Sequence, residues 1–153
     1  MERLAHAARL EWDGATGEGY RAYSRNHTGT APPAHASLRL SADPHFRGDP
    51  DLLNPEQLVV LAAASCQLLS FLSVAARKHV DVVRYTDDAT GFLSEDLRHA
   101  RIELIELNPV VHVVAGTDEE LVLRLVEQAH EECYIARSLI SEVTVGATVR
   151  VAR

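Results

Sequence analysis

The longest apolar stretch of the chain covers residues 58–76 and follows a strong helix-start signal. Asn54 is a favoured N-cap residue, Pro55 suits the first helical position, and Gln57 stands three residues after the cap, as in a capping box. The pattern predicts a helix over residues 54–78 with apolar side chains nearly all round. Such a helix must be buried on most faces. A lone small domain does not normally have enough core to bury a helix of this kind, which indicates that a second subunit covers part of it.

Polar side chains interrupt the apolar stretch at Ser65, Gln67, Ser70 and Ser73, which favours a buried helix over a membrane span. The chain does not open on a charged and apolar leader with a cleavage site, so secretion is not expected. The net charge of -7, without a basic stripe, argues against nucleic acid and anionic membranes as partners. We therefore expect a cytoplasmic protein that binds neither.

Outside this helix, alternation of apolar and polar residues predicts strands at 7–13, 19–25, 35–40, 80–93, 99–115 and 143–151. Gly14 to Gly17 predicts a hairpin between the first two strands, and Pro109 indicates a bulge or an edge position. Thr117, with Glu120 three residues later, predicts the cap of a second helix that ends near Cys133.

The order of elements is three strands, helix, two strands, helix, strand, which is typical of the α+β class. The chain has 153 residues, 46% of them hydrophobic, and no internal repeat or linker. We expect one domain over residues 1–153, with enough apolar residues for a sizeable core.

The chain has two cysteines, Cys66 on the long helix and Cys133 at the end of the second. A structural disulfide is unusual in the cytoplasm, so a pair that meets is more often catalytic or metal-binding. Free Cys is also among the most buried residue types, so Cys66 could equally be a core residue. Cys133 lies beside Glu131 and Glu132, and carboxylates raise a thiol pKa. Cys133 therefore suits a second nucleophile better than a first.

A zinc site is the alternative that the histidines suggest. His130 and Cys133 are three residues apart on one helix face and could both bind the ion. Two more ligands would have to come from Cys66, His27, His79 or His112, which show no ligand spacing. We expect neither a metal nor another cofactor.

Five segments, in this order, resemble segments of one known family: Tyr-Ser-Arg-Asn-His (23–27), Pro-His-Phe-Arg-Gly-Asp-Pro (44–50), Asn-Pro-Glu-Gln-Leu (54–58), Ala-Ala-Ala-Ser-Cys (62–66) and Ala-His-Glu-Glu-Cys (129–133). The family is the OsmC/Ohr family of thiol peroxidases. The resemblance implies an OsmC-like fold with a long buried central helix, built as an intertwined homodimer.

By this resemblance Cys66 is the peroxidatic cysteine, Cys133 resolves it, and Glu56 and Arg25 tune the first thiol. The expected reaction reduces organic hydroperoxides, and the sequence leaves open whether H2O2 is also a substrate. Cys66 becomes a sulfenic acid that condenses with Cys133, and an external dithiol, lipoyl or thioredoxin-like, reduces the disulfide. The rival interpretations are a non-catalytic OsmC-like protein that binds a small apolar or thiol-reactive ligand, and a thiol redox sensor.

Helix geometry constrains this site. Glu56 and Cys66 are ten residues apart, so a straight helix separates them by about 15 Å and turns them roughly 80° apart. Either the helix breaks near residues 62–65, or the Glu56 that matters belongs to a second subunit, as the resemblance favours. We expect each site to combine both cysteines of one chain with Glu56 and Arg25 of the other.

The chain departs from the better-known peroxidases at two positions. Gln67 stands where many members carry Phe or another apolar residue, and Tyr134 where they commonly carry Pro. Arg21 and Arg47 lie near Arg25 and could take its role. The match of residues 23–27 alone favours Arg25.

Overall fold

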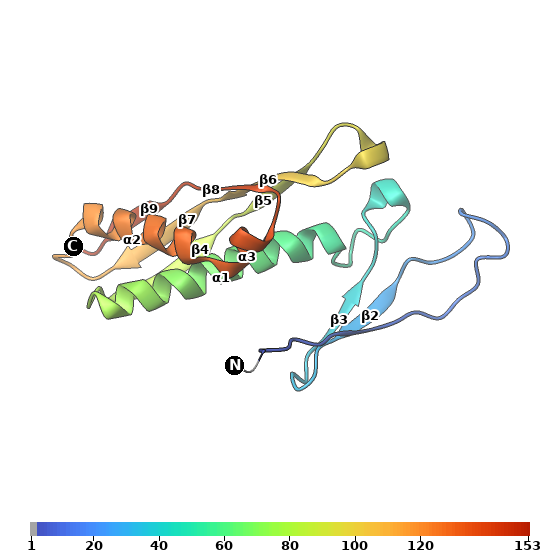
Figure 1. The fold of residues 1–153 in the computed structure, drawn as a ribbon, viewed down its shortest axis with the longest axis horizontal. Helices are drawn as coiled ribbons and strands as arrows, with labels where there is room; N and C mark the ends of the chain where they lie inside the picture. The colour runs from blue at the N-terminus through green and yellow to red at the C-terminus, as the bar shows by residue number, and fades with distance from the viewer. Residues whose placement is uncertain (1–2) are drawn as a thin grey trace. The chain divides into compact units, whose positions relative to one another are not determined.

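The computed structural model describes residues 3–153, which form two compact units with the boundary after Leu58. The first unit contains an antiparallel sheet in the order β1-β2-β3 (Figure 1). Its strands are β1 (Arg9–Glu11), β2 (His27–Thr30) and β3 (Ser37–Leu40). The predicted first and third strands are therefore confirmed in shortened form. The predicted strand over residues 19–25 and its hairpin are wrong.

Residues 19–25 form turns that contacts with Trp12 and among their own aromatic side chains hold in a compact loop. Trp12 donates its indole N–H to the Ser24 carbonyl at 2.8 Å. The ring of Tyr23 stands edge-on to both Trp12 and Tyr20, with centroids 6.2 and 6.4 Å apart. Gly19 has a φ of 98°, a left-handed conformation that favours glycine. These contacts replace the ladder that a strand would form.

A folded connection follows β3 and contains the short 3-10 helix η1 (Pro44–Phe46). Its cap is Asp43, whose carboxylate accepts the His45 N–H at 2.8 Å. The buried Ser41 hydroxyl accepts the Asp49 N–H at 3.0 Å. A Cβ at Gly48 would lie 1.6 Å from the Ala42 carbonyl oxygen, so only glycine fits this close approach.

The long helix α1 (Pro55–Arg77) begins as predicted. Asn54 and Gln57 cap it reciprocally, because the Gln57 N–H donates to the Asn54 side chain at 2.8 Å and the Asn54 N–H donates to the Gln57 side chain at 2.9 Å. The helix is continuous, so the predicted alternative of a break near residues 62–65 does not occur.

The second unit is built on three long strands that are all interrupted at one level. β4 (Val82–Asp87) and β5 (Thr90–Leu93) form one outer strand, β6 (Ile102–Leu107) and β7 (Pro109–Val113) the central strand, and β8 (Glu142–Val145) and β9 (Thr148–Val151) the other outer strand. The outer strand of β4 and β5 pairs antiparallel with the central strand, and the outer strand of β8 and β9 pairs parallel with it. At the interruption, Asp87 accepts the Asn108 N–H at 2.7 Å and Gly146 donates to the Leu107 carbonyl at 2.8 Å.

Two helices complete this unit, α2 (Glu119–Glu132) and the short α3 (Tyr134–Ser138), together with the 3-10 helix η2 (Leu97–His99). Figure 1 shows α1 and α2 side by side next to the strands. Their shared core contains Phe71 of α1, Val122 and Val126 of α2, Val111 of β7 and Val149 of β9. A second cluster joins α1 and α3 to β6. The arrangement confirms the α+β class.

Two local predictions need correction. The cap of α2 is Asp118, which accepts the Glu120 N–H at 3.0 Å. Thr117 donates its hydroxyl to the Val114 carbonyl instead, at 2.7 Å. Pro109 is the first residue of a central strand, where its missing N–H costs no ladder bond, and it is neither at a bulge nor at an edge.

Only part of α1 is covered by its own chain. Its buried residues are Ala63, Gln67, Phe71, Val74 and Ala75. Leu61, Leu69 and Leu72 remain exposed by 58%, 64% and 40%. By length and composition alone α1 could also cross a membrane, with a mean hydropathy of 2.1 and 28% of that window buried. The core helix of a soluble protein meets the same criteria.

Candidate thiol site

The two cysteines, 67 positions apart in sequence, meet in the second unit. Both are free thiols, and they lie close enough for each to shift the pKa of the other. Cys66 lies on α1 and is partly exposed, whereas Cys133 is buried at the junction where α2 ends and α3 begins. The contact brings together the two groups that a dithiol reaction requires.

The surroundings of Cys66 favour its thiolate. Burial acts to raise the pKa of Cys66, but hydrogen bonds from the Cys133 thiol, the backbone N–H groups of Ile135 and Tyr134, and the Ser70 hydroxyl outweigh it. The pKa of Cys66 therefore lies below its ordinary value. This lowering arises from groups of the second unit, without a guanidinium.

Cys133 is shifted in the opposite direction. Burial, followed by the hydrogen bond to Cys66, raises its pKa, and the N–H groups of Ala136 and Ile135 offset only part of the rise. The Ala136 N–H donates to the Cys133 sulfur at 3.5 Å. The raised pKa agrees with the sequence-based expectation, but its cause is burial and the neighbouring thiol, not the adjacent carboxylates. Cys66 is the better first nucleophile and Cys133 the better second one.

Gln67 ties the cysteine-bearing turn of α1 to α2. Its side chain is fully buried, and its amide N–H donates to the Val126 carbonyl at 3.1 Å. The amide oxygen of Gln67 is buried without a partner. Sequence reasoning identified Gln67 as a departure from the family pattern, but could not assign it this cross-helix bond.

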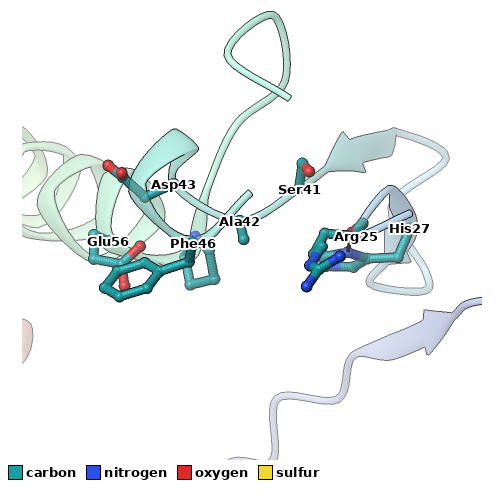
Figure 2. A pocket seen from close by; sticks show the side chains of 8 residues that line it. Arg25, His27, Ser41, Ala42, Asp43, Phe46 and Glu56 are labelled. Atoms are coloured by element: carbon teal, nitrogen blue, oxygen red, sulfur yellow. Dashed lines mark hydrogen bonds between the residues drawn. The ribbon is translucent and has the colours of Figure 1, made fainter. Parts of the chain in front are cut away.

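A separate pocket of about 290 Å³ lies within the first unit. Its lining residues are Arg25, His27, Ser41, Ala42, Asp43, Phe46, Pro55 and Glu56. Figure 2 shows Glu56 and Phe46 toward one end of this pocket and Arg25 and His27 toward the other. The structure thus places the two predicted tuning residues, Glu56 and Arg25, at one pocket, together with His27 and Phe46, which sequence reasoning did not assign to the site.

The guanidinium of Arg25 is held by the aromatic loop. It donates to the carbonyls of Tyr23 and Tyr20 and lies over both rings, 3.7 Å from the Tyr23 centroid and 4.6 Å from that of Tyr20. Glu56 forms no ion pair with Arg25 within residues 3–153, and its Oε2 is buried without a partner. A buried carboxylate oxygen of this kind favours a donor from a ligand or from a second chain.

The remaining sequence-based candidates do not gather into a further centre. Within the described part of the chain, no group of three or more His, Cys, Asp or Glu side chains could hold a metal ion. His130, which the zinc alternative placed beside Cys133, has a buried Nδ1 without a partner. Ser70 was missed, although its position four residues after Cys66 could have identified it as a helix-face neighbour.

Comparisons with known proteins identify the family of the chain. Residues 48–148 match the family model described as OsmC-like protein. No curated protein matches the chain. The resemblance of the sequence to the OsmC/Ohr family is thereby confirmed.

Solved structures show the same fold. An OsmC-like protein of unknown function from Vibrio cholerae is 30% identical, with a TM-score of 0.83 over 95% of this chain and 100% of that one. An organic hydroperoxide resistance protein from Elizabethkingia anophelis, with crystallant-derived thiocyanate bound, is 19% identical, with a TM-score of 0.71 over 99% and 100%. The organic hydroperoxide resistance protein OhrB of Bacillus subtilis is 18% identical, with a TM-score of 0.63 over 96% and 98%.

Proposed function

This chain belongs to the OsmC-like family, and from that premise we propose that it is a cysteine-based peroxidase that reduces organic hydroperoxides. The observation that carries the proposal is the proximity of Cys66 and Cys133, together with the opposite directions of their pKa shifts. A core cysteine requires neither a second thiol beside it nor donors directed at its sulfur.

The first step uses the thiolate of Cys66. Its sulfur attacks the terminal oxygen of the hydroperoxide, the O–O bond breaks, and the alkoxide leaves as an alcohol after taking up a proton. The peroxide is reduced by two electrons, and Cys66 becomes a sulfenic acid. The surroundings that lower the pKa of Cys66 increase its thiolate fraction at any given pH near the pKa.

The second step uses Cys133. Its sulfur attacks the sulfur of the sulfenic acid, water leaves, and a Cys66–Cys133 disulfide forms. An external dithiol, lipoyl or thioredoxin-like, then exchanges with this disulfide and restores both thiols. We place the protein in the cytoplasm, where such reductants keep thiols reduced.

The complete site in this proposal requires a homodimer. Glu56 and Cys66 are separated by ten residues of one unbroken helix, about 15 Å along its axis, so Glu56 does not reach Cys66 of its own chain. Arg25 and Glu56 of one subunit would instead complete the thiol pair of the partner. The exposed leucines of α1 offer an apolar face that a second subunit would bury.

Organic hydroperoxides are favoured over H2O2 by the lining of the Arg25–Glu56 pocket. Phe46, Pro55 and Ala42 give this pocket apolar walls that suit an alkyl or aryl tail, whereas Arg25 can bind a peroxide oxygen. Two solved structures with the same fold are named organic hydroperoxide resistance proteins, which supports the same substrate class.

The test is a thiol count. Reduced protein is treated with one equivalent of cumene hydroperoxide, the free thiols are titrated over time, and the disulfide is mapped by mass spectrometry. We expect rapid loss of both thiols and a Cys66–Cys133 disulfide. Cys66→Ser should abolish the reaction, and Cys133→Ser should stop it at the Cys66 sulfenic acid. Two persistent thiols in wild-type protein would contradict the peroxidase and favour a non-catalytic binding protein.

A further inference from the structure

The guanidinium of Arg25 packs against two aromatic rings of its own loop. Its central carbon lies 3.7 Å from the centroid of the Tyr23 ring and 4.6 Å from that of the Tyr20 ring. The two rings stand at 83° to each other, so they form a corner that holds the guanidinium. We propose that Tyr20 and Tyr23 are positioning residues, which hold Arg25 at the pocket in the orientation that peroxide reduction requires. The proposal deepens the proposed function and rests on Arg25 taking part in it.

The same loop fixes the direction of the guanidinium donors. A guanidinium has five N–H donors in a rigid plane. One donor of Nη1 is bound to the Tyr23 carbonyl and one of Nη2 to the Tyr20 carbonyl. Because the group is rigid, two bound donors also fix the direction of the donors that remain for a ligand of the pocket. Arg25 is therefore oriented before any peroxide binds, which lowers the entropy cost of binding.

Further contacts support this arrangement from the side of the loop. Trp12 stands edge-on to the Tyr23 ring, with centroids 6.2 Å apart, and donates its indole N–H to the Ser24 carbonyl at 2.8 Å. The His27 ring donates its Nδ1–H to the Arg25 carbonyl at 2.7 Å, and Figure 2 shows the two side chains together at one end of the pocket. Both the side chain and the backbone of Arg25 are thus held.

Burial does not explain the two tyrosines. Tyr20 is 58% exposed, although its ring faces the Arg25 guanidinium. Arg25 lines the pocket, whereas Tyr20 and Tyr23 are not among the residues that line it. Their effect on a ligand of the pocket must therefore pass through Arg25.

The chain offers matched variants for this contact. Tyr23→Leu removes the ring and keeps the backbone carbonyl, whereas Tyr23→Phe keeps the ring face and loses only the hydroxyl. Tyr20→Leu is the second variant, because it leaves the contact between Trp12 and Tyr23 in place. Trp12 is the only tryptophan of the chain, so its fluorescence emission, compared with that of the unfolded chain, shows whether the loop stays folded.

The first experiment measures kcat/KM for cumene hydroperoxide. A cation–π contact at an exposed site is worth a factor of roughly two to five in an equilibrium. We expect a loss of about fivefold in Tyr23→Leu and about twofold in Tyr20→Leu, and Tyr23→Phe should restore most of the rate. In an Arg25→Ala background neither leucine substitution should have a further effect, because both act through the guanidinium. An unchanged kcat/KM in both leucine variants, or equal losses with and without Arg25, overturns the proposal.

The second experiment needs no turnover. An aromatic ring shields protons above its face, so the Nε–H proton of Arg25 should resonate upfield of its position in the unfolded chain. Tyr23→Leu should move this resonance downfield and Tyr23→Phe should not. A resonance of Arg25 at the unfolded position in wild-type protein overturns the proposal. If wild-type protein reduces no hydroperoxide, the proposed function fails, and this resonance alone decides whether the rings hold Arg25.

Discussion

At the scale of single residues, the shifts at Cys66 and Cys133 predict which thiol reacts first. The pKa of Cys66 is lowered, so Cys66 is ionised at a pH where an ordinary thiol is protonated. The pKa of Cys133 is raised, so Cys133 is ionised only at a pH higher than an ordinary thiol requires. At neutral pH, iodoacetamide should therefore label Cys66 first, and the preference should narrow as the pH rises. Equal labelling at neutral pH would contradict the assignment.

Removing the Cys133 donor should weaken the thiolate of Cys66. Cys133→Ala deletes the hydrogen bond to Cys66, so we expect the pKa of Cys66 to rise, which moves its alkylation midpoint to higher pH. Cys133→Ser is the control, because its hydroxyl still donates. Thiolate absorbance at 240 nm measures both variants. Equal midpoints in the two variants would show that the hydrogen bond from position 133 does not matter.

Gln67 should be replaceable by an apolar residue of similar size without loss of stability. Gln67→Leu removes a buried unpartnered oxygen, and the Val126 carbonyl keeps its helical partner, so we expect unchanged or higher stability. Gln67→Ala leaves a cavity and should cost about 2 kcal/mol or more. Urea unfolding at equal protein concentration measures both. If Gln67→Leu is as unstable as Gln67→Ala, the bond to Val126 is essential.

The residues of the candidate site differ in how far the sequence could predict them. The family pattern identified Cys66, Cys133, Glu56 and Arg25, and their catalytic roles remain predictions. The N–H groups of Tyr134 and Ile135 could not be found, because backbone donors have no side-chain signature and depend on how α3 packs against α1. His27 and Phe46 reach the pocket through the fold of the first unit.

At the scale of elements, the sequence predicted the features that depend on contacts between residues close together in the chain. The cap of α1 was correct because Asn54 and Gln57 bond each other within one turn. The long strands were correct in extent, but the pattern could not show that all three are interrupted at one level. At that level the Asn108 N–H donates to the Asp87 side chain across the sheet, a contact between residues 21 positions apart. Residues 19–25 alternate like a strand, yet aromatic contacts around Tyr23 fold them into turns.

The corrected cap of α2 predicts unequal costs at two neighbouring positions. Asp118→Ala removes the acceptor of the Glu120 N–H and should lower the free energy of unfolding by about 1 kcal/mol. Thr117→Ala removes one exposed bond to the Val114 carbonyl and should cost about 0.5 kcal/mol or less. Urea unfolding of both variants measures the two losses and shows which residue caps α2. A larger loss for Thr117→Ala would restore Thr117 to that role.

At the scale of the whole molecule, α1 explains why one chain is not expected to be the functional unit. Leu61, Leu69 and Leu72 project from α1 within roughly 80° of one another, on a face that the chain leaves exposed. Burying these leucines against a second copy would remove apolar area from water. The same helix holds Glu56 and Cys66 apart, so a dimer would satisfy both the packing and the site.

Mixing two inactive variants tests whether sites are shared between subunits. Cys66→Ser lacks the nucleophile and Glu56→Gln lacks the carboxylate, so each homodimer should be nearly inactive. In a mixed dimer with shared sites, one site is doubly defective and the other combines wild-type Cys66 with wild-type Glu56. Because random exchange makes half of the dimers mixed, about a quarter of the wild-type peroxidase rate should return. If each site belongs to a single chain, every site carries one defect. Subunit exchange would then restore no activity, although native mass spectrometry of subunits with tags of different mass detects the mixed dimers.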